Sequence, residues 1–322
     1  MNNFNKKIPI IVFLFYFIST LIIGLSIQLI ILPFIFTDLH AGNGLLIKGD
    51  WNTYHWMAID LKNIIEKDGW SKFNLFYNGQ APAGLAGFFY TLIYPKPISV
   101  LPLNCIFHAI GGLTLFFIMK NLNQNNIISF ISSSVFVFFP SSILLYSQIH
   151  KDAYYNAGIL MYILSWLIFI SCINHNKKGF FTISTFLIIF SLISIFIFRP
   201  YFIKVLLIIN LTLTLIICIK FFIHIFSKKE NKSYGVINII KFILFLLFTK
   251  IFILFLENTD DFSHSEAFKA NVLEKDDIKK VDISGDKIVL LVDNEEELEE
   301  KIKRISTNTS TSTDIIDSVS SE

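Results

Sequence analysis

Residues Ile8–Phe36 read IPIIVFLFYFISTLIIGLSIQLIILPFIF, a run of 29 residues without a charged side chain. A helix needs about 20 mainly apolar residues to cross the hydrocarbon core of a bilayer. A secretory signal peptide has an apolar region of only about 7–15 residues, followed by a small-residue cleavage site. We therefore interpret this run, which follows Lys6 and Lys7, as a membrane helix that the protein retains.

The composition extends this interpretation to most of the chain. Hydrophobic residues make up 53% of the 322 residues, mean hydropathy is +0.60 and charged residues make up 16%, against about 25% in ordinary globular proteins. A soluble fold of this length could not cover so much apolar surface, which excludes a soluble enzyme. The sequence therefore predicts an all-α polytopic membrane protein with about seven transmembrane helices. The six further spans are Ile98–Met119, Ile127–Ser147, Ala153–Ile173, Phe180–Phe198, Phe202–Phe226 and Gly235–Leu256.

The charges divide the chain into a basic membrane domain, residues 1–256, and an acidic tail, residues 257–322. The tail holds 18 acidic and 8 basic residues, and the remainder holds 7 acidic and 19 basic residues. This division makes nucleic acid an improbable partner. In the tail, Lys287–Val292 is predicted to be a strand, Asn294–Arg304 a helix, and Ser306–Glu322, rich in Ser and Thr, disordered.

Lysine clusters predict the orientation, because short cytoplasmic loops are enriched in Lys and Arg. Counting membrane crossings places all three clusters on the inner side, with the N-terminus inside and the acidic tail outside. These clusters are Lys6 and Lys7, Lys177 and Lys178, and Lys228, Lys229 and Lys232. This topology requires that Gly84–Tyr94, at 11 residues, does not span; we interpret it as a re-entrant or interfacial segment.

The outer side then receives the long loop 37–97 and two short junctions. Within the loop, Trp51–Lys67 has apolar residues at spacings of three and four, with charged residues on the other side. This pattern predicts an amphipathic helix lying on the outer membrane surface. The junctions are His150-Lys151-Asp152 and Arg199-Pro200-Tyr201.

Each candidate site residue has a structural and a functional interpretation. Asp50 is either the N-cap of the surface helix or a carboxylate that accepts a proton or holds a cation. His150, Lys151 and Asp152 are either a cap with a snorkelling lysine or an anion-binding helix start. Arg199 is either a membrane anchor or a bidentate phosphate ligand, and we favour the ligand because the chain contains 25 Lys and only two Arg.

The order of these elements resembles that of the C-type membrane glycosyltransferases, which include the protein mannosyltransferases and the aminoarabinose transferases. The resemblance covers roughly residues 8–226. One helix is followed by a long outer loop that opens with an Asp, a Tyr four residues on and an Ala eight residues on. Trp51 stands where many members have a second acidic residue, and the family usually has more helices. The matching residues are Asp50, Tyr54 and Ala58, Pro102-Leu103-Asn104, His108-Ala109 and the stretch Pro140–Asp152.

The resemblance implies an inverting transferase of the cytoplasmic membrane that moves a sugar from a polyprenyl-phosphate donor to an unidentified glycan, lipid or protein acceptor. Asp50 would be the general base, Asp152 would orient the acceptor or a divalent cation, and Arg199 with Lys151 would stabilise the departing phosphate. His150 could replace any of these, and Tyr54 would belong to the site. No other cofactor is indicated, because the sequence has no zinc, dinucleotide or P-loop motif. The alternatives are a non-catalytic scaffold or polysaccharide-export component and, less favoured, a transporter.

Overall fold

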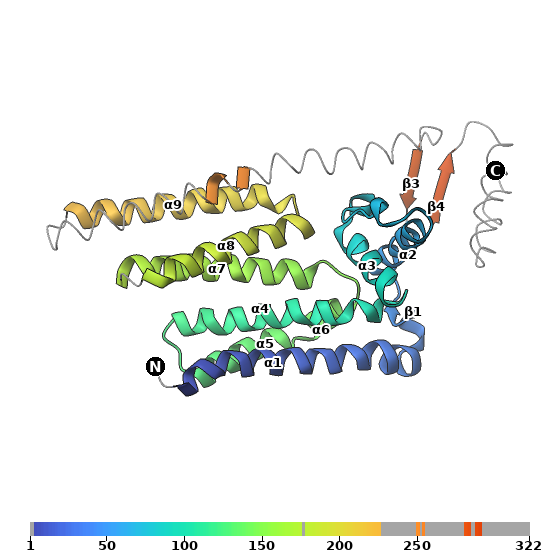
Figure 1. The fold of residues 1–322 in the computed structure, drawn as a ribbon, viewed down its shortest axis with the longest axis horizontal. Coiled ribbons are helices and arrows are strands. Elements are labelled where there is room, and N and C mark those ends of the chain that lie inside the picture. Colours follow the sequence, from blue (N-terminus) through green and yellow to red (C-terminus); the bar gives the residue numbers. More distant parts are fainter. Residues whose placement is uncertain are drawn as a thin grey trace. The chain divides into compact units, whose positions relative to one another are not determined.

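A computed structural model describes residues 3–175, 178–226, 249–251, 253–254, 280–284 and 287–291. The chain divides into two compact units, residues 1–265 and 266–322. The first unit is an antiparallel bundle of long helices, with shorter helices at one of its ends (Figure 1). Its helices are α1 (Asn3–Ser26), continued as a π-helix, η1 (Ile27–Ile35), and α2 (Asp50–Asp68), α3 (Ala81–Leu92), α4 (Leu101–Asn121), α5 (Asn126–Val137), α6 (Pro140–Tyr146), α7 (Asp152–His175), α8 (Lys178–Phe198) and α9 (Phe202–Phe226).

Within the described residues, four helices are long and apolar enough to cross a membrane, and the bent pair α5–α6 would make a fifth span. The four are Lys7–Ile35, Leu101–Asn121, Asp152–Ser171 and Phe181–Phe198. α9 coincides with the sixth predicted span, and its apolar part Phe202–Ile216 is shorter. The seventh, Gly235–Leu256, lies mostly outside the described residues. The apolar helices indicate a membrane protein.

The predicted span Ile127–Ser147 is wrong as one straight helix. α5 and α6 meet at a bend of 60°. Phe139, between them, is extended, with φ −65° and ψ 131°. This conformation follows from Pro140, whose ring disfavours helical geometry in the residue before it and which has no N–H to continue the helix. The bend frees backbone carbonyls in the middle of an apolar segment, and other side chains must satisfy them.

The bundle alternates in direction, so the segments between helices gather at two ends (Figure 1). Residues 37–97, 147–151 and 199–201 lie at one end, and the turn 122–125 lies at the end that carries the N-terminus. α7 packs against α4 and α8, and α4 also packs against α1 and α5. This order confirms that the long loop and the two short junctions meet at the same end of the bundle.

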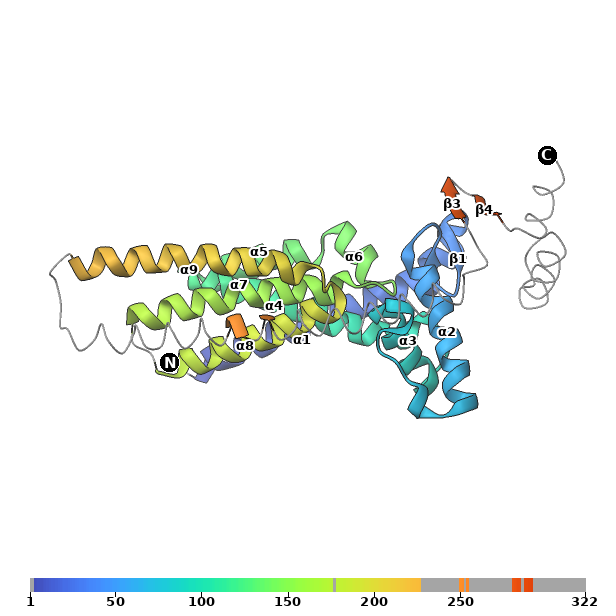
Figure 2. The same cartoon turned by 90° about the horizontal axis from the view of Figure 1, so that it is seen from above.

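The amphipathic helix is present as α2, but its apolar stripe has a different partner from the one predicted. Tyr54, Ala58, Leu61 and Ile65 are at most 4% exposed because α2 packs against α3. Figure 2 shows the two helices side by side at the end of the bundle. The stripe is therefore covered by protein instead of lipid, and α3, with 12 residues, is too short to span, as predicted.

The second unit contains one antiparallel pair of strands among its described residues, β3 (Lys280–Ser284) and β4 (Lys287–Leu291), with Lys280 opposite Leu291 and Ser284 opposite Lys287. β4 falls within the strand predicted at Lys287–Val292. The predicted helix Asn294–Arg304 and the predicted disordered segment Ser306–Glu322 lie outside the described residues.

Candidate functional site

The junction between α6 and α7 carries three of the predicted site residues. α7 begins at Asp152, so His150 and Lys151 lie in the turn before it. Residues adjacent in a helix do not share a face, but this turn lets all three contribute to one site. The backbone N–H of Asp152 donates to Nδ1 of His150 at 3.3 Å, and the same Nδ1 lies 3.5 Å from Oδ2 of Asp152.

Arg199, at the end of α8, is held by three side chains. Its Nη2 donates to Oδ1 of Asp152 at 2.5 Å, and its Nη1 donates to the hydroxyl of Tyr201 at 3.1 Å. Its guanidinium carbon lies 4.6 Å from the ring centre of Tyr155, within cation–π range. Although partial burial acts in the opposite direction, the hydrogen bond and negative charge of Asp152 raise the pKa of Arg199. Its Nε is buried and has no hydrogen-bond partner among the residues that the structure describes.

His150 is surrounded by charged groups from four segments of the chain. Its side chain is 11% exposed, and its ring lies 6.0 Å from that of Trp51. Burial lowers its pKa; the negative charges of Asp152 and Asp50 oppose this shift, while Lys151 and Arg199 reinforce it. The lowered pKa favours the neutral imidazole, in which one ring nitrogen can accept a proton.

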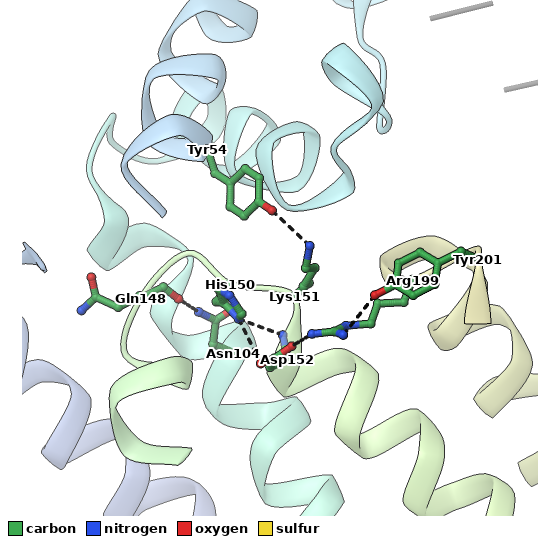
Figure 3. Close-up of polar contacts among 8 residues, drawn as sticks. All are labelled: Tyr54, Asn104, Gln148, His150, Lys151, Asp152, Arg199 and Tyr201. Atoms are coloured by element: carbon green, nitrogen blue, oxygen red, sulfur yellow. Dashed lines mark hydrogen bonds and ion pairs between the residues drawn. The ribbon is translucent and has the colours of Figure 1, made fainter. Parts of the chain in front are cut away.

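Tyr54 brings α2 to the same place (Figure 3), and Asp50, at the start of the same helix, acts on its hydroxyl. The N-cap interpretation of Asp50 is wrong, because Gly49 occupies that position and Asp50 is the first residue of α2, with an exposed side chain. Burial, followed by the charge of Asp50 and hydrogen bonding to it, raises the pKa of Tyr54 to about 12. Nζ of Lys151 lies 3.5 Å from the Tyr54 hydroxyl.

A cleft of about 320 Å³ opens beside this cluster. Residues 79–82, at the start of α3, form one wall, and residues 197–198 and 200–201, around the α8–α9 turn, form the other. Among the described residues that line the cleft, Lys151 is the one charged side chain. Ile197, Phe198 and Pro200 make the second wall largely apolar. The cleft can therefore accept an anionic group together with an apolar portion of the same ligand.

All six predicted site residues thus belong to one electrostatic cluster: Asp50, Tyr54, His150, Lys151, Asp152 and Arg199. Sequence reasoning did not single out Tyr201, Tyr155 and Gln148 as residues of the site. Tyr201, two residues after Arg199, could have been included from its position. Tyr155 and Gln148 gave no signal, because an aromatic residue in an apolar helix and a glutamine in a junction are common.

Within the described residues, no group of three or more His, Cys, Asp or Glu side chains could hold a metal ion. Asp152 already pairs with Arg199. A divalent cation at this position would therefore need most of its ligands from substrate and water.

Comparisons with known proteins give no relative: no family model, no curated protein and no solved structure matches the chain.

Proposed function

We propose that the protein is a membrane glycosyltransferase that moves a sugar from a polyprenyl-phosphate donor to an acceptor at the end of the bundle that carries the charged cluster. We assign this end to the outer face of the cytoplasmic membrane, with the N-terminus inside and the acidic tail outside. The lysine clusters of the sequence support this orientation.

The observation that carries the proposal is the cluster of six polar side chains beside a cleft that is lined by the cation Lys151 and by one largely apolar wall. A lipid-linked phosphate combines the two chemistries that such a lining recognises. The negative charge would lie near Lys151, and the first part of the prenyl chain would lie against Ile197 and Phe198. A substrate with both properties reaches this cleft from the membrane.

In this proposal Asp50 is the general base that accepts the proton of the acceptor hydroxyl. Its carboxylate is exposed at the start of α2 and lies beside Tyr54, where an acceptor can approach from water. Lys151 stabilises the charge that develops on the departing phosphate, because its ammonium has only the 3.5 Å contact with Tyr54 among the described residues. Arg199 uses one N–H of Nη2 for Asp152 and one N–H of Nη1 for Tyr201, so the second N–H of either Nη could donate to the phosphate while the ion pair stays in place.

A specific observation favours the alternative, a non-catalytic scaffold. Arg199, the residue for which phosphate recognition was predicted, has its guanidinium shared between Asp152, Tyr201 and Tyr155. This arrangement joins the start of α7 to the α8–α9 turn and needs no ligand. A scaffold would keep this pair and would not depend on Asp50.

Sugar transfer by the purified protein separates the two functions. The protein is reconstituted in liposomes and supplied with radiolabelled polyprenyl-phosphate hexoses, together with a membrane extract as the source of acceptor. Asp50→Asn is expected to lower kcat/KM by about 10²–10⁴, as for removal of a general base. Asp60→Asn, an exposed carboxylate on the same helix, is the matched control and should retain activity. Transfer by Asp50→Asn at the parent rate would refute the assigned base, and no transfer by the parent would favour the scaffold.

A further inference from the structure

The last residue of α6 and the two residues after it have three consecutive backbone carbonyls, and buried amide side chains from other helices bind all of them. Asn104, on α4, donates from Nδ2 to the carbonyl of Tyr146 at 3.0 Å and to that of Gln148 at 2.7 Å. Gln28, on η1, donates to the carbonyl of Ser147 at 2.5 Å. The last carbonyls of a helix have no partner within it, and in an apolar environment each must find one elsewhere. The path of this junction is therefore set by side chains from two other helices.

Asn104 has every polar atom of its side chain engaged. Besides its two donated bonds, its Oδ1 accepts a bond of 2.5 Å from the hydroxyl of Tyr154, in the first turn of α7. The residue is 2% exposed, so water does not compete for these groups. One amide thus ties α4 to both sides of the segment that carries His150, Lys151 and Asp152; Figure 3 shows its contact with Gln148.

His108 does the same at the bend between α5 and α6. It lies four residues after Asn104, on the same face of α4, and its Nε2 donates to the carbonyl of Val137, the last residue of α5, at 3.0 Å. One face of α4 thus binds the carbonyls of Val137, Tyr146 and Gln148, while η1 binds that of Ser147. Asn104 is the member of this pair that contacts the junction itself.

The junction also carries the link to the outer loop. The side chain of Gln148 accepts from the backbone N–H of Leu46 at 3.0 Å, and the carbonyl of Leu46 accepts from Trp51 and Asn52 of α2. A displacement of Gln148 would therefore be transmitted to α2, which carries Asp50 and Tyr54. His150 is only two residues further along the junction.

We infer that Asn104 is a positioning residue of the candidate site: through the carbonyls of Tyr146 and Gln148 it fixes the junction that places His150, Lys151 and Asp152. The inference rests on the candidate site of the proposed function, but not on sugar transfer. Asn104 does not contact a ligand in this role. Its effect reaches the site through the backbone of residues 146–148.

The test uses the chemistry of His150, which faces Asp50 of α2, Lys151 of the junction, Asp152 of α7 and Arg199 at the end of α8. The full-length protein in detergent is treated with diethyl pyrocarbonate at several pH values. Mass spectrometry of the peptide that contains His150 gives the rate of modification, and the peptide that contains His55, buried between α2 and α3, is the internal reference. The variants are Asn104→Leu and, as matched control, Asn210→Leu. Asn210, on α9, is 3% exposed, and among the described residues its side chain has a single polar contact, at 3.5 Å with Tyr162.

In Asn104→Leu the junction loses both donors and opens locally, so we expect the His150 modification rate at pH 8 to rise by about threefold or more. The pH midpoint of the reaction should also move upward, because burial, which lowers the pKa of His150, is relieved. Asn210→Leu should change neither value. If Asn104→Leu does not fold, Asn104→Ser, which retains one donor, should give a smaller change in the same direction.

An unchanged rate and midpoint for His150 in a folded Asn104 variant would overturn the inference, even if that variant were less stable. Equal changes at His150 and His55 would also overturn it, since they would indicate general loosening instead of a displaced junction. Because the measurement needs no substrate, a protein that transfers no sugar can still support or refute the role of Asn104.

Discussion

The pair Asp152–Arg199 should stabilise the bundle independently of any ligand. It joins the start of α7 to the end of α8 through Nη2 and Oδ1, 2.5 Å apart, and the two side chains are 18% and 25% exposed. We consider the variants Asp152→Ala, Arg199→Ala and the double variant. Together with the parent they form a double-mutant cycle, which isolates the energy of the pair from the other effects of each substitution.

The coupling energy of the Asp152–Arg199 pair can be estimated from how deeply the pair is buried. An exposed ion pair contributes about 0–1 kcal/mol, and breaking a fully buried pair costs about 3–5 kcal/mol because one charge is left unpaired. This pair lies between the two limits, so we expect a coupling energy of about 2 kcal/mol, within the usual range for hydrogen bonds to charged groups. Arg199→Ala also loses the contact with the Tyr155 ring, worth about 0.5–1 kcal/mol. Arg199→Ala should therefore lower the free energy of unfolding by about 3 kcal/mol.

The free energy of unfolding is measured in mixed micelles with an increasing fraction of denaturing detergent, followed by circular dichroism and tryptophan fluorescence. Agreement of the two signals checks that unfolding is two-state. The double variant should be less destabilised than the sum of the single variants. Additivity within about 0.5 kcal/mol would refute the reasoning, because two side chains that bind each other cannot be lost independently. The charge-exchanged variant Asp152→Arg/Arg199→Asp should recover part of the stability, and it should recover transfer activity only if neither charge contacts substrate.

Three further predictions concern orientation, α2 and pH. In a cysteine-free background, a membrane-impermeant thiol reagent added from outside should modify Lys72→Cys and not Asn123→Cys. The reason is that residues 37–97 and the turn 122–125 lie at opposite ends of the bundle. The reverse labelling pattern would invert the assigned topology. Leu61, on α2, is buried, so Leu61→Asp should lower the free energy of unfolding by about 3 kcal/mol or more and speed proteolysis of residues 37–97. Asn63→Asp, on the exposed face of α2, should do neither. Equal proteolysis of the two variants would contradict the α2–α3 packing. Burial lowers the pKa of His55 to about 4, so the unfolded state binds more protons than the folded state. The free energy of unfolding should therefore fall as the pH decreases from about 6.5 to about 4. His55→Gln should reduce this part of the pH dependence, and an unchanged slope of unfolding free energy against pH would show that His55 is not the cause.

The sequence by itself determined that this is a helical membrane protein and that the polar residues of the loop and junctions meet at one end of the bundle. Runs such as Ile8–Phe36 are local signals, since length and apolarity are enough to predict a spanning helix. Alternation of direction then places loop 37–97 and the junctions at 150–152 and 199–201 together. The apolar stripe of α2 was equally visible from its spacing.

Only the tertiary structure decided which groups pair with one another. Asp152 and Arg199 are 47 residues apart, and the carbonyls bound by Asn104 are 42 and 44 residues away; no local spacing encodes such pairs. Apolar periodicity predicts that one face of α2 is buried, but it does not identify the partner that buries this face. Only the structure shows that α3 covers the stripe instead of lipid. Likewise, the hydropathy of Ile127–Ser147 predicted one span, and the 60° bend and the side chains that satisfy its free carbonyls became visible only in the packing against α4 and η1. Hydropathy is a property of single segments, whereas hydrogen-bond satisfaction in an apolar bundle is a property of their packing.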